Sequence, residues 1–115
     1  MSRPARSELI AKGGDFAPIF AALGDPTRLS LLAKLCDGMP CSISKLTQDT
    51  KLTRQAITKH LKVLQQARLV QSTRTGRESR FAFNPKPIEA VQQYLDIVSR
   101  QWDDALDRLR SLVER

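Results

Sequence analysis

The sequence contains little of what disulfide frameworks, metal sites and membrane spans are built from. Its 115 residues include two cysteines, one histidine and 5% aromatic residues. Two cysteines cannot form a disulfide framework, and no apolar run approaches the ~20 residues of a membrane span. No nucleophile with a nearby base, glycine-rich phosphate loop or paired carboxylates is evident, so no enzyme is expected. The start of the chain has no apolar stretch of signal-peptide length, which predicts a cytoplasmic protein.

Basic residues, in contrast, are plentiful and clustered. The formal net charge is +7. Residues 53–80 hold seven Lys and Arg against one acidic residue, whereas the rest of the chain is nearly balanced. Clustering of this kind indicates a polyanion partner, and the alternative is a solvated basic face.

Proline, glycine and capping residues divide the chain into segments. We expect a flexible arm over residues 1–14 and a single domain over 15–115. The domain begins with a helix that ends at Gly24. A second helix is capped by Asp25 and followed by a short extended piece. The remaining elements predict a mostly α fold with a small β-hairpin.

The two cysteines lie at the end of the second helix and in the extended piece. Cys36 continues the apolar spacing of Leu29 and Leu32, so we expect it to be buried as a small hydrophobic residue. Cys41 is expected to be half-buried. A redox switch that bridges the two thiols is the alternative.

Residues 42–67 have the pattern of two helices joined by a short turn. Ser42 can cap the first, and Thr53 can cap the second, in which Ile57, Leu61 and Leu64 form an apolar stripe. The opposite face is then left to five polar residues, namely Arg54, Gln55, Thr58, Lys59 and Lys62. These side chains have the donors, acceptors and charges that read bases in the major groove or contact phosphates.

Residues 69–83 predict a β-hairpin that follows directly. Gly76 supplies the turn, and Arg74, Arg77 and Arg80 surround it. Beside a reader helix, such a basic hairpin is best interpreted as a wing that contacts neighbouring phosphates or the minor groove.

The last helix, over residues 86–113, has apolar residues at alternating steps of three and four from Ile88 to Leu112. A heptad seam of this length indicates pairing with a second copy of the chain. The alternative is that the seam packs only against its own domain.

Several stretches resemble, in order and spacing, the ArsR/SmtB family of winged helix-turn-helix repressors: "LGDPTRLSLLAKL", "SISKL", "LTRQAITKHLKVLQQARLV" and "RTGRESRFAFNP". The resemblance implies a homodimeric repressor on a pseudo-palindromic operator, with the C-terminal helix pairing with the first helix across the dimer. The expected DNA-binding residues are Thr53, Arg54, Gln55, Thr58, Lys59, His60, Lys62, Arg74, Arg77 and Arg80. The expected dimerisation residues are Phe16, Phe20, Val91, Leu95, Val98, Trp102 and Leu109.

The chain departs from the metal sensors of that family. Ser42 and Ser44 occupy the positions of a common Cys-x-Cys pair, and hydroxyls are poor ligands for soft metals. The last helix has no histidine, and His60 on the reader helix is expected either to contact a phosphate or to pack between helices. We therefore expect no metal and no cofactor. A non-specific nucleic-acid binder and a redox-responsive repressor using Cys36 and Cys41 stay as alternative functions.

Overall fold

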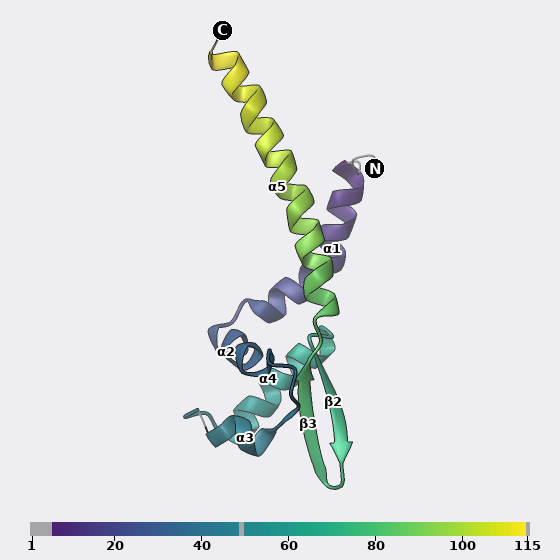
Figure 1. The fold of residues 1–115 in the computed structure, drawn as a ribbon, viewed down its shortest axis with the longest axis vertical. Helices are drawn as coiled ribbons and strands as arrows, with labels where there is room; N and C mark the ends of the chain where they lie inside the picture. Colours follow the sequence, from purple (N-terminus) through teal and green to yellow (C-terminus); the bar gives the residue numbers. More distant parts are fainter. Residues whose placement is uncertain (1–5, 49, 115) are drawn as a thin grey trace. The chain divides into compact units, whose positions relative to one another are not determined.

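The computed structural model describes residues 6–48 and 50–114. The mostly helical architecture with a small antiparallel sheet is the expected one (Figure 1). Among the described residues, no helix is long and apolar enough to cross a membrane. The elements in chain order are α1 (Arg6–Leu23), α2 (Pro26–Leu35), β1 (Cys41–Ser42), α3 (Ile43–Gln48), α4 (Arg54–Gln66), β2 (Val70–Thr75), β3 (Glu78–Phe83) and α5 (Lys86–Val113).

The described residues fall into two compact units, a division that the expected single domain over 15–115 did not include. One unit is Ala17–Pro87, and the other joins α1 up to Phe16 to α5 from Ile88 onward. The boundary in α1 falls just before Pro18, which lies inside this helix. Proline removes one backbone hydrogen bond from a helix, so it is a common place for the axis to bend.

The N-terminal segment differs from the flexible arm expected over residues 1–14, because the chain is helical from Arg6 onward. Residues 1–5 lie outside the described part. The helix packs closely against α5: a Cβ added at Gly13 would lie 2.8 Å from the hydroxyl of Tyr94, and the rings of Phe16 and Tyr94 are 5.3 Å apart. Packing against α5, which is distant in the sequence, therefore offsets the low helix propensity of the adjacent Gly13 and Gly14.

Helix α2 begins as expected, but a different face is buried. The Asp25 carboxylate accepts a hydrogen bond from the backbone N–H of Arg28, and Pro26 opens the helix. The buried side chains are Leu31, Leu32 and Leu35, whereas Leu29 is half exposed. Cys36 follows the last helical residue as the C-cap and is exposed, so the expectation that it is buried was wrong.

Helices α3 and α4 form the expected helix-turn-helix. The Ser42 hydroxyl accepts from the backbone N–H of Lys45, and the Thr53 hydroxyl accepts from that of Ala56, so both expected caps are present. The apolar stripe of α4, Ile57, Leu61 and Leu64, is fully buried. These three side chains fix which face of α4 points outward.

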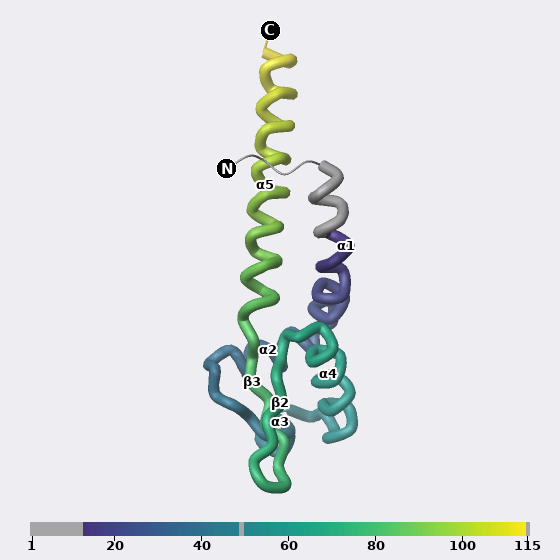
Figure 2. The backbone as a smooth tube through the Cα atoms, turned by 90° about the vertical axis from the view of Figure 1, so that its right-hand side faces the viewer, coloured from purple at the N-terminus to yellow at the C-terminus, as the bar shows by residue number. Residues whose placement is uncertain are grey.

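The sheet has one strand more than the expected hairpin. Its order is β1-β3-β2 and both pairs are antiparallel. Cys41 on β1 lies opposite Phe81 on β3, and both side chains are buried, so Cys41 is more deeply buried than expected. The strands β2 and β3 are joined by a turn that contains Gly76 with a φ of +64°. Their tip extends past α3 and α4 in both views (Figures 1 and 2).

Candidate nucleic-acid interface

The outward face of α4 carries the polar residues that the sequence places there. Ile57, Leu61 and Leu64 recur about one turn apart and are buried, which turns the polar positions on the opposite side of the helix outward. The exposed side chains are Thr53, Arg54, Gln55, Thr58, Lys59 and Lys62. The helix is thus amphipathic, with one buried apolar half and one exposed half that is polar and basic.

Besides Thr53, whose hydroxyl caps α4, two residues of this face are engaged in local hydrogen bonds. The Arg54 guanidinium donates through Nη1 to the Ser44 hydroxyl, at 2.8 Å. The Thr58 hydroxyl donates to the backbone carbonyl of Arg54, at 2.7 Å, although the residue as a whole is exposed. Arg54 is therefore oriented toward α3 rather than along the outer face of α4.

His60 is separated from the exposed group. It is half-buried. Its Nδ1 lies 4.0 Å from the Asp25 carboxylate and 3.5 Å from Nη1 of Arg28. The pKa of Asp25 is lowered, chiefly by the hydrogen bond from the Arg28 backbone, with the charges of Arg28 and His60 acting in the same direction. Of the two roles expected for His60, this geometry favours packing between helices over phosphate contact.

The three wing arginines do not share one surface. Arg74 lies opposite Ser79 in the register, on the face of the hairpin that also carries the buried Phe81. Arg80 lies on the opposite face, where its Nε donates to the Glu78 carboxylate at 3.2 Å. Arg77 occupies the turn. The sequence indicated a basic hairpin tip, but period-two alternation divides its charges between two faces.

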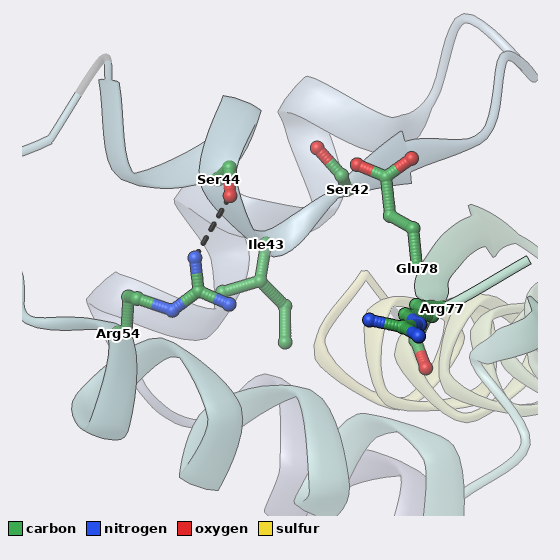
Figure 3. A pocket seen from close by; sticks show the side chains of 7 residues that line it. Ser42, Ile43, Ser44, Arg54, Arg77 and Glu78 are labelled. Carbon is green, nitrogen blue, oxygen red and sulfur yellow. Dashed lines mark hydrogen bonds between the residues drawn. The ribbon is translucent and has the colours of Figure 1, made fainter.

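A hollow of about 380 Å³ lies between the helix-turn-helix and the wing (Figure 3). Arg54 and Ser44 are on one side of it, and Arg77 and Glu78 are on another. The sequence did not identify this juxtaposition, because Ser44 and Arg54 are ten residues apart across a turn and show no periodic signal. Ser42, Ile43 and Ser79 complete the lining.

Comparison with known proteins identifies the family. Residues 25–72 match the model of the bacterial regulatory protein, arsR family. The chain is 40% identical over 82 residues to the HTH-type transcriptional regulator YuzN of Bacillus subtilis, covering 66% of this chain and 89% of that one. An ArsR-like transcriptional regulator from Rhodococcus sp. RHA1 superposes with a TM-score of 0.84 and 33% identity, over 91% of this chain and 95% of that one. The chain belongs to the ArsR family.

A further relative is the arsenical resistance operon repressor of Bacillus subtilis, at 28% identity over 86 residues, which cover 75% of this chain and 79% of that protein. The relatives are transcriptional regulators with a helix-turn-helix. This ArsR-family chain is accordingly a DNA-binding transcriptional regulator. The match over residues 25–72 includes α2, α3 and α4, the segment that carries the exposed basic face.

In this ArsR-family chain, most residues expected at a dimer interface are uncovered. Phe20, Leu95, Trp102 and Leu109 are exposed, with Trp102 at 66%. The remaining three differ: Val98 is half-buried, Val91 is buried, and Phe16 contacts Tyr94 of its own chain. The uncovered residues continue along α5 through Leu106 and Leu112.

Proposed function

We propose that this ArsR-family protein is a homodimeric repressor that binds a pseudo-palindromic operator through the outer face of α4 and the wing. The observation that carries the proposal is the two-sided character of α4: Ile57, Leu61 and Leu64 are at most 1% exposed, while the opposite face is polar and basic. A helix with one face fixed in the core and the other solvated is suited to enter the major groove.

Residues at the start and middle of that face supply base-reading chemistry. Gln55 can bond bidentately to adenine, and the methyl group of the exposed Thr58 can contact the methyl of thymine. Lys59 and Lys62 can reach guanine or a phosphate. These side chains support the proposal of a sequence-specific reader over a protein that binds DNA through lysine charge alone.

Dimerisation is supported by the apolar stripe of α5. Leu95, Trp102 and Leu109 recur at heptad spacing and stay about half exposed or more. Such a seam is stabilised when a second copy covers it. In a two-fold dimer the reader helices would contact half-sites one DNA turn, about 34 Å, apart.

Repression is the outcome we propose for operator binding. A dimer seated over promoter DNA excludes the polymerase from the same surface, and the arsenical resistance operon repressor is a relative of this chain. The proposed repressor does not respond to a metal through the Cys-x-Cys positions of the family's metal sensors. Ser42 and Ser44 replace the thiolates, and the Ser44 oxygen already accepts a hydrogen bond from a cation, Arg54. Among the described residues, no three His, Cys, Asp or Glu side chains are grouped as a metal site.

Selection of bound duplexes from a random pool tests the proposal. The expected result is a motif with two inverted half-sites whose centres are about 10 base pairs apart. A pool that stays random would contradict it and would favour the non-specific nucleic-acid binder instead. Repeating the selection with and without reductant examines the redox alternative, since exposed Cys36 and buried Cys41 would then change affinity on oxidation.

The reader assignment is tested with Gln55→Ala on the selected operator. We expect a loss of about 1–3 kcal/mol and a relaxed preference at one base pair of each half-site. Gln66→Ala, at the exposed far end of the same helix, is the matched control. An unchanged base preference in the Gln55 variant would contradict the reader role.

A further inference from the structure

The hollow between the start of α4 and the wing tip is lined by arginine and serine side chains to which the proposed base contacts give no role. We propose that it is the binding site for one backbone phosphate of the bound DNA, with Arg54, Ser44 and Arg77 as the residues that contact this phosphate. The assignment rests on the proposed function, in that it concerns the same DNA complex. It changes the role of Arg54 from base reader to phosphate ligand.

The orientation of Arg54 is the first argument. Its Nη1 donates to the Ser44 hydroxyl at 2.8 Å, which holds the planar guanidinium at the edge of the hollow (Figure 3). A guanidinium has five N–H donors, and this bond uses one of them. The others are available for an oxyanion, and a side chain already held in place loses less rotamer freedom on binding.

Ser44 supplies the second argument. Its oxygen accepts from a cation, so its own proton is free to be donated in another direction. Acceptance from a charged donor polarises the hydroxyl and makes it a stronger donor to an anion. Ser42 differs, because its oxygen accepts from the backbone N–H of Lys45 as the cap of α3. Of the two serines at the former thiolate positions, Ser44 is the one suited to an anion.

The charge around the hollow is the third argument. Arg77 approaches from the wing turn, so a bound phosphate would be held from both the helix-turn-helix and the wing. Glu78 also lines the hollow, and its carboxylate is offset by Arg80, whose Nε lies 3.2 Å away. Two arginines against one paired glutamate leave the hollow positive. Its volume, about 380 Å³, corresponds to roughly a dozen water molecules of liquid, enough for a phosphate with residual hydration.

The test is a methylphosphonate scan of the selected operator, in which one phosphate at a time is made neutral. The wild-type protein is expected to lose about tenfold or more at one position of each half-site, as befits a hydrogen bond to a charged group. Arg54→Ala is expected to bind every sequence about 10–100-fold more weakly and to keep the wild-type base preference. Neutralising the phosphate at that one position should no longer lower its affinity. Its salt dependence should fall by about 0.9 in slope per contacted phosphate.

Two further variants and a control sharpen the result. Ser44→Ala should show a smaller loss of the same kind. Glu78→Gln should bind DNA several-fold more tightly at unchanged base preference, because a negative charge leaves the hollow and Arg80 is released. Arg100→Ala removes a cation from the outer heptad face of α5 and should leave the scan unchanged. Circular dichroism spectra verify that each variant is folded.

The outcomes separate this inference from the proposed function. If the wild-type protein selected no motif from the random pool, sequence-specific repression would be overturned. The methylphosphonate scan can still be made on any fixed duplex. Arg54→Ala could instead change the preference at one base pair and still lose affinity at every phosphate whose neutralisation weakens the wild type. That result would overturn the phosphate-binding site and make Arg54 a base reader. Binding of inorganic phosphate by the wild type but not by Arg54→Ala, without coupling in the scan, would assign the hollow to a free oxyanion and overturn the DNA assignment.

Discussion

Helices α4 and α5 carry similar amphipathic patterns but differ in what covers their apolar stripes. In α4, Ile57, Leu61 and Leu64 are at most 1% exposed. In α5, Trp102 and Leu109 are 66% and 57% exposed. Similar apolar periods therefore serve two different ends: the stripe of α4 attaches the helix to the chain's own core, whereas much of the stripe of α5 is left exposed, where we propose that a second copy binds. A periodic pattern identifies the apolar face of a helix, whereas the burial of that face shows whether the chain's own core covers it.

The largest expected effect is on the free energy of unfolding, which should respond differently to truncation of the α4 stripe and of the α5 stripe. Leu61→Ala removes a side chain that is 1% exposed and leaves a cavity, so it should lower the free energy of unfolding by about 2–5 kcal/mol. Urea unfolding followed by circular dichroism measures this change. Leu109→Ala, compared at a concentration where the chain is monomeric, should change it by no more than about 0.5 kcal/mol. Equal losses in both variants would mean that the stripe of α5 is covered within its own chain.

The next effect concerns assembly. Leu95→Asp combined with Trp102→Asp places charges on the exposed stripe of α5, and a second copy would have to bury them unpaired. We expect a folded monomer in sedimentation experiments and a loss of operator affinity of about 100-fold or more, since the half-sites are no longer bound together.

Gln93→Asp is the matched control, because it adds a charge at an exposed position on the outer heptad face. It should leave both the assembly and DNA binding as they are. A double variant that still sedimented as a dimer would refute this interface.

The same comparison explains what could be predicted from sequence. The caps at Asp25, Ser42 and Thr53 and the stripe of α4 follow from local chemistry and period, and each was found where expected. In α2, leucines at neighbouring positions permit more than one apolar face. The face containing Leu31 and Leu35 is buried, so the spacing that placed Cys36 inside was misleading.

Long-range pairing was the other source of error. The bond between Arg54 and Ser44 and the addition of β1 to the sheet depend on where the chain returns in space. No local signal specifies these contacts. Residue types and period indicate which basic side chains of α4 are exposed, whereas the side chains that share a face follow only from the fold.

A smaller effect tests the carboxylate that caps α2. Asp25 caps α2 and lies 4.0 Å from His60 of α4, and its pKa is lowered below its ordinary value of 3.8 by the Arg28 backbone hydrogen bond. Because the folded-state pKa lies below the unfolded one, this contribution is complete above about pH 3.8 and is lost as the pH falls through the lower folded value.

Asp25→Asn keeps a good capping side chain but does not titrate. The stability of the wild type relative to this variant should therefore be constant near neutral pH and decline in acid, as measured by urea unfolding at a series of pH values. A relative stability that did not change between about pH 5 and 2 would show that the hydrogen bond does not favour the ionised form.

The smallest effect concerns how α4 ends. Arg68 adopts a φ of +62° just after the helix, and the backbone N–H groups of Arg68 and Leu69 donate to the carbonyls of Gln65 and Leu64. This is the bond pattern of a Schellman motif, whose left-handed position favours glycine. Arg68→Gly should relieve the left-handed strain and, after the entropic cost of glycine, stabilise the protein by up to about 1 kcal/mol.

Two variants isolate that effect in thermal or urea unfolding. Arg68→Ala removes the same charge while keeping a Cβ, so it should leave stability within about 0.5 kcal/mol of the wild type. Gly76→Ala, at a φ of +64° in open space, should have the opposite sign and cost about 1–2 kcal/mol, since its side chain meets no neighbour and only the backbone is strained. If Arg68→Gly were no more stable than Arg68→Ala, the end of α4 would be held by its packing through Leu69, which is fully buried, rather than limited by backbone strain.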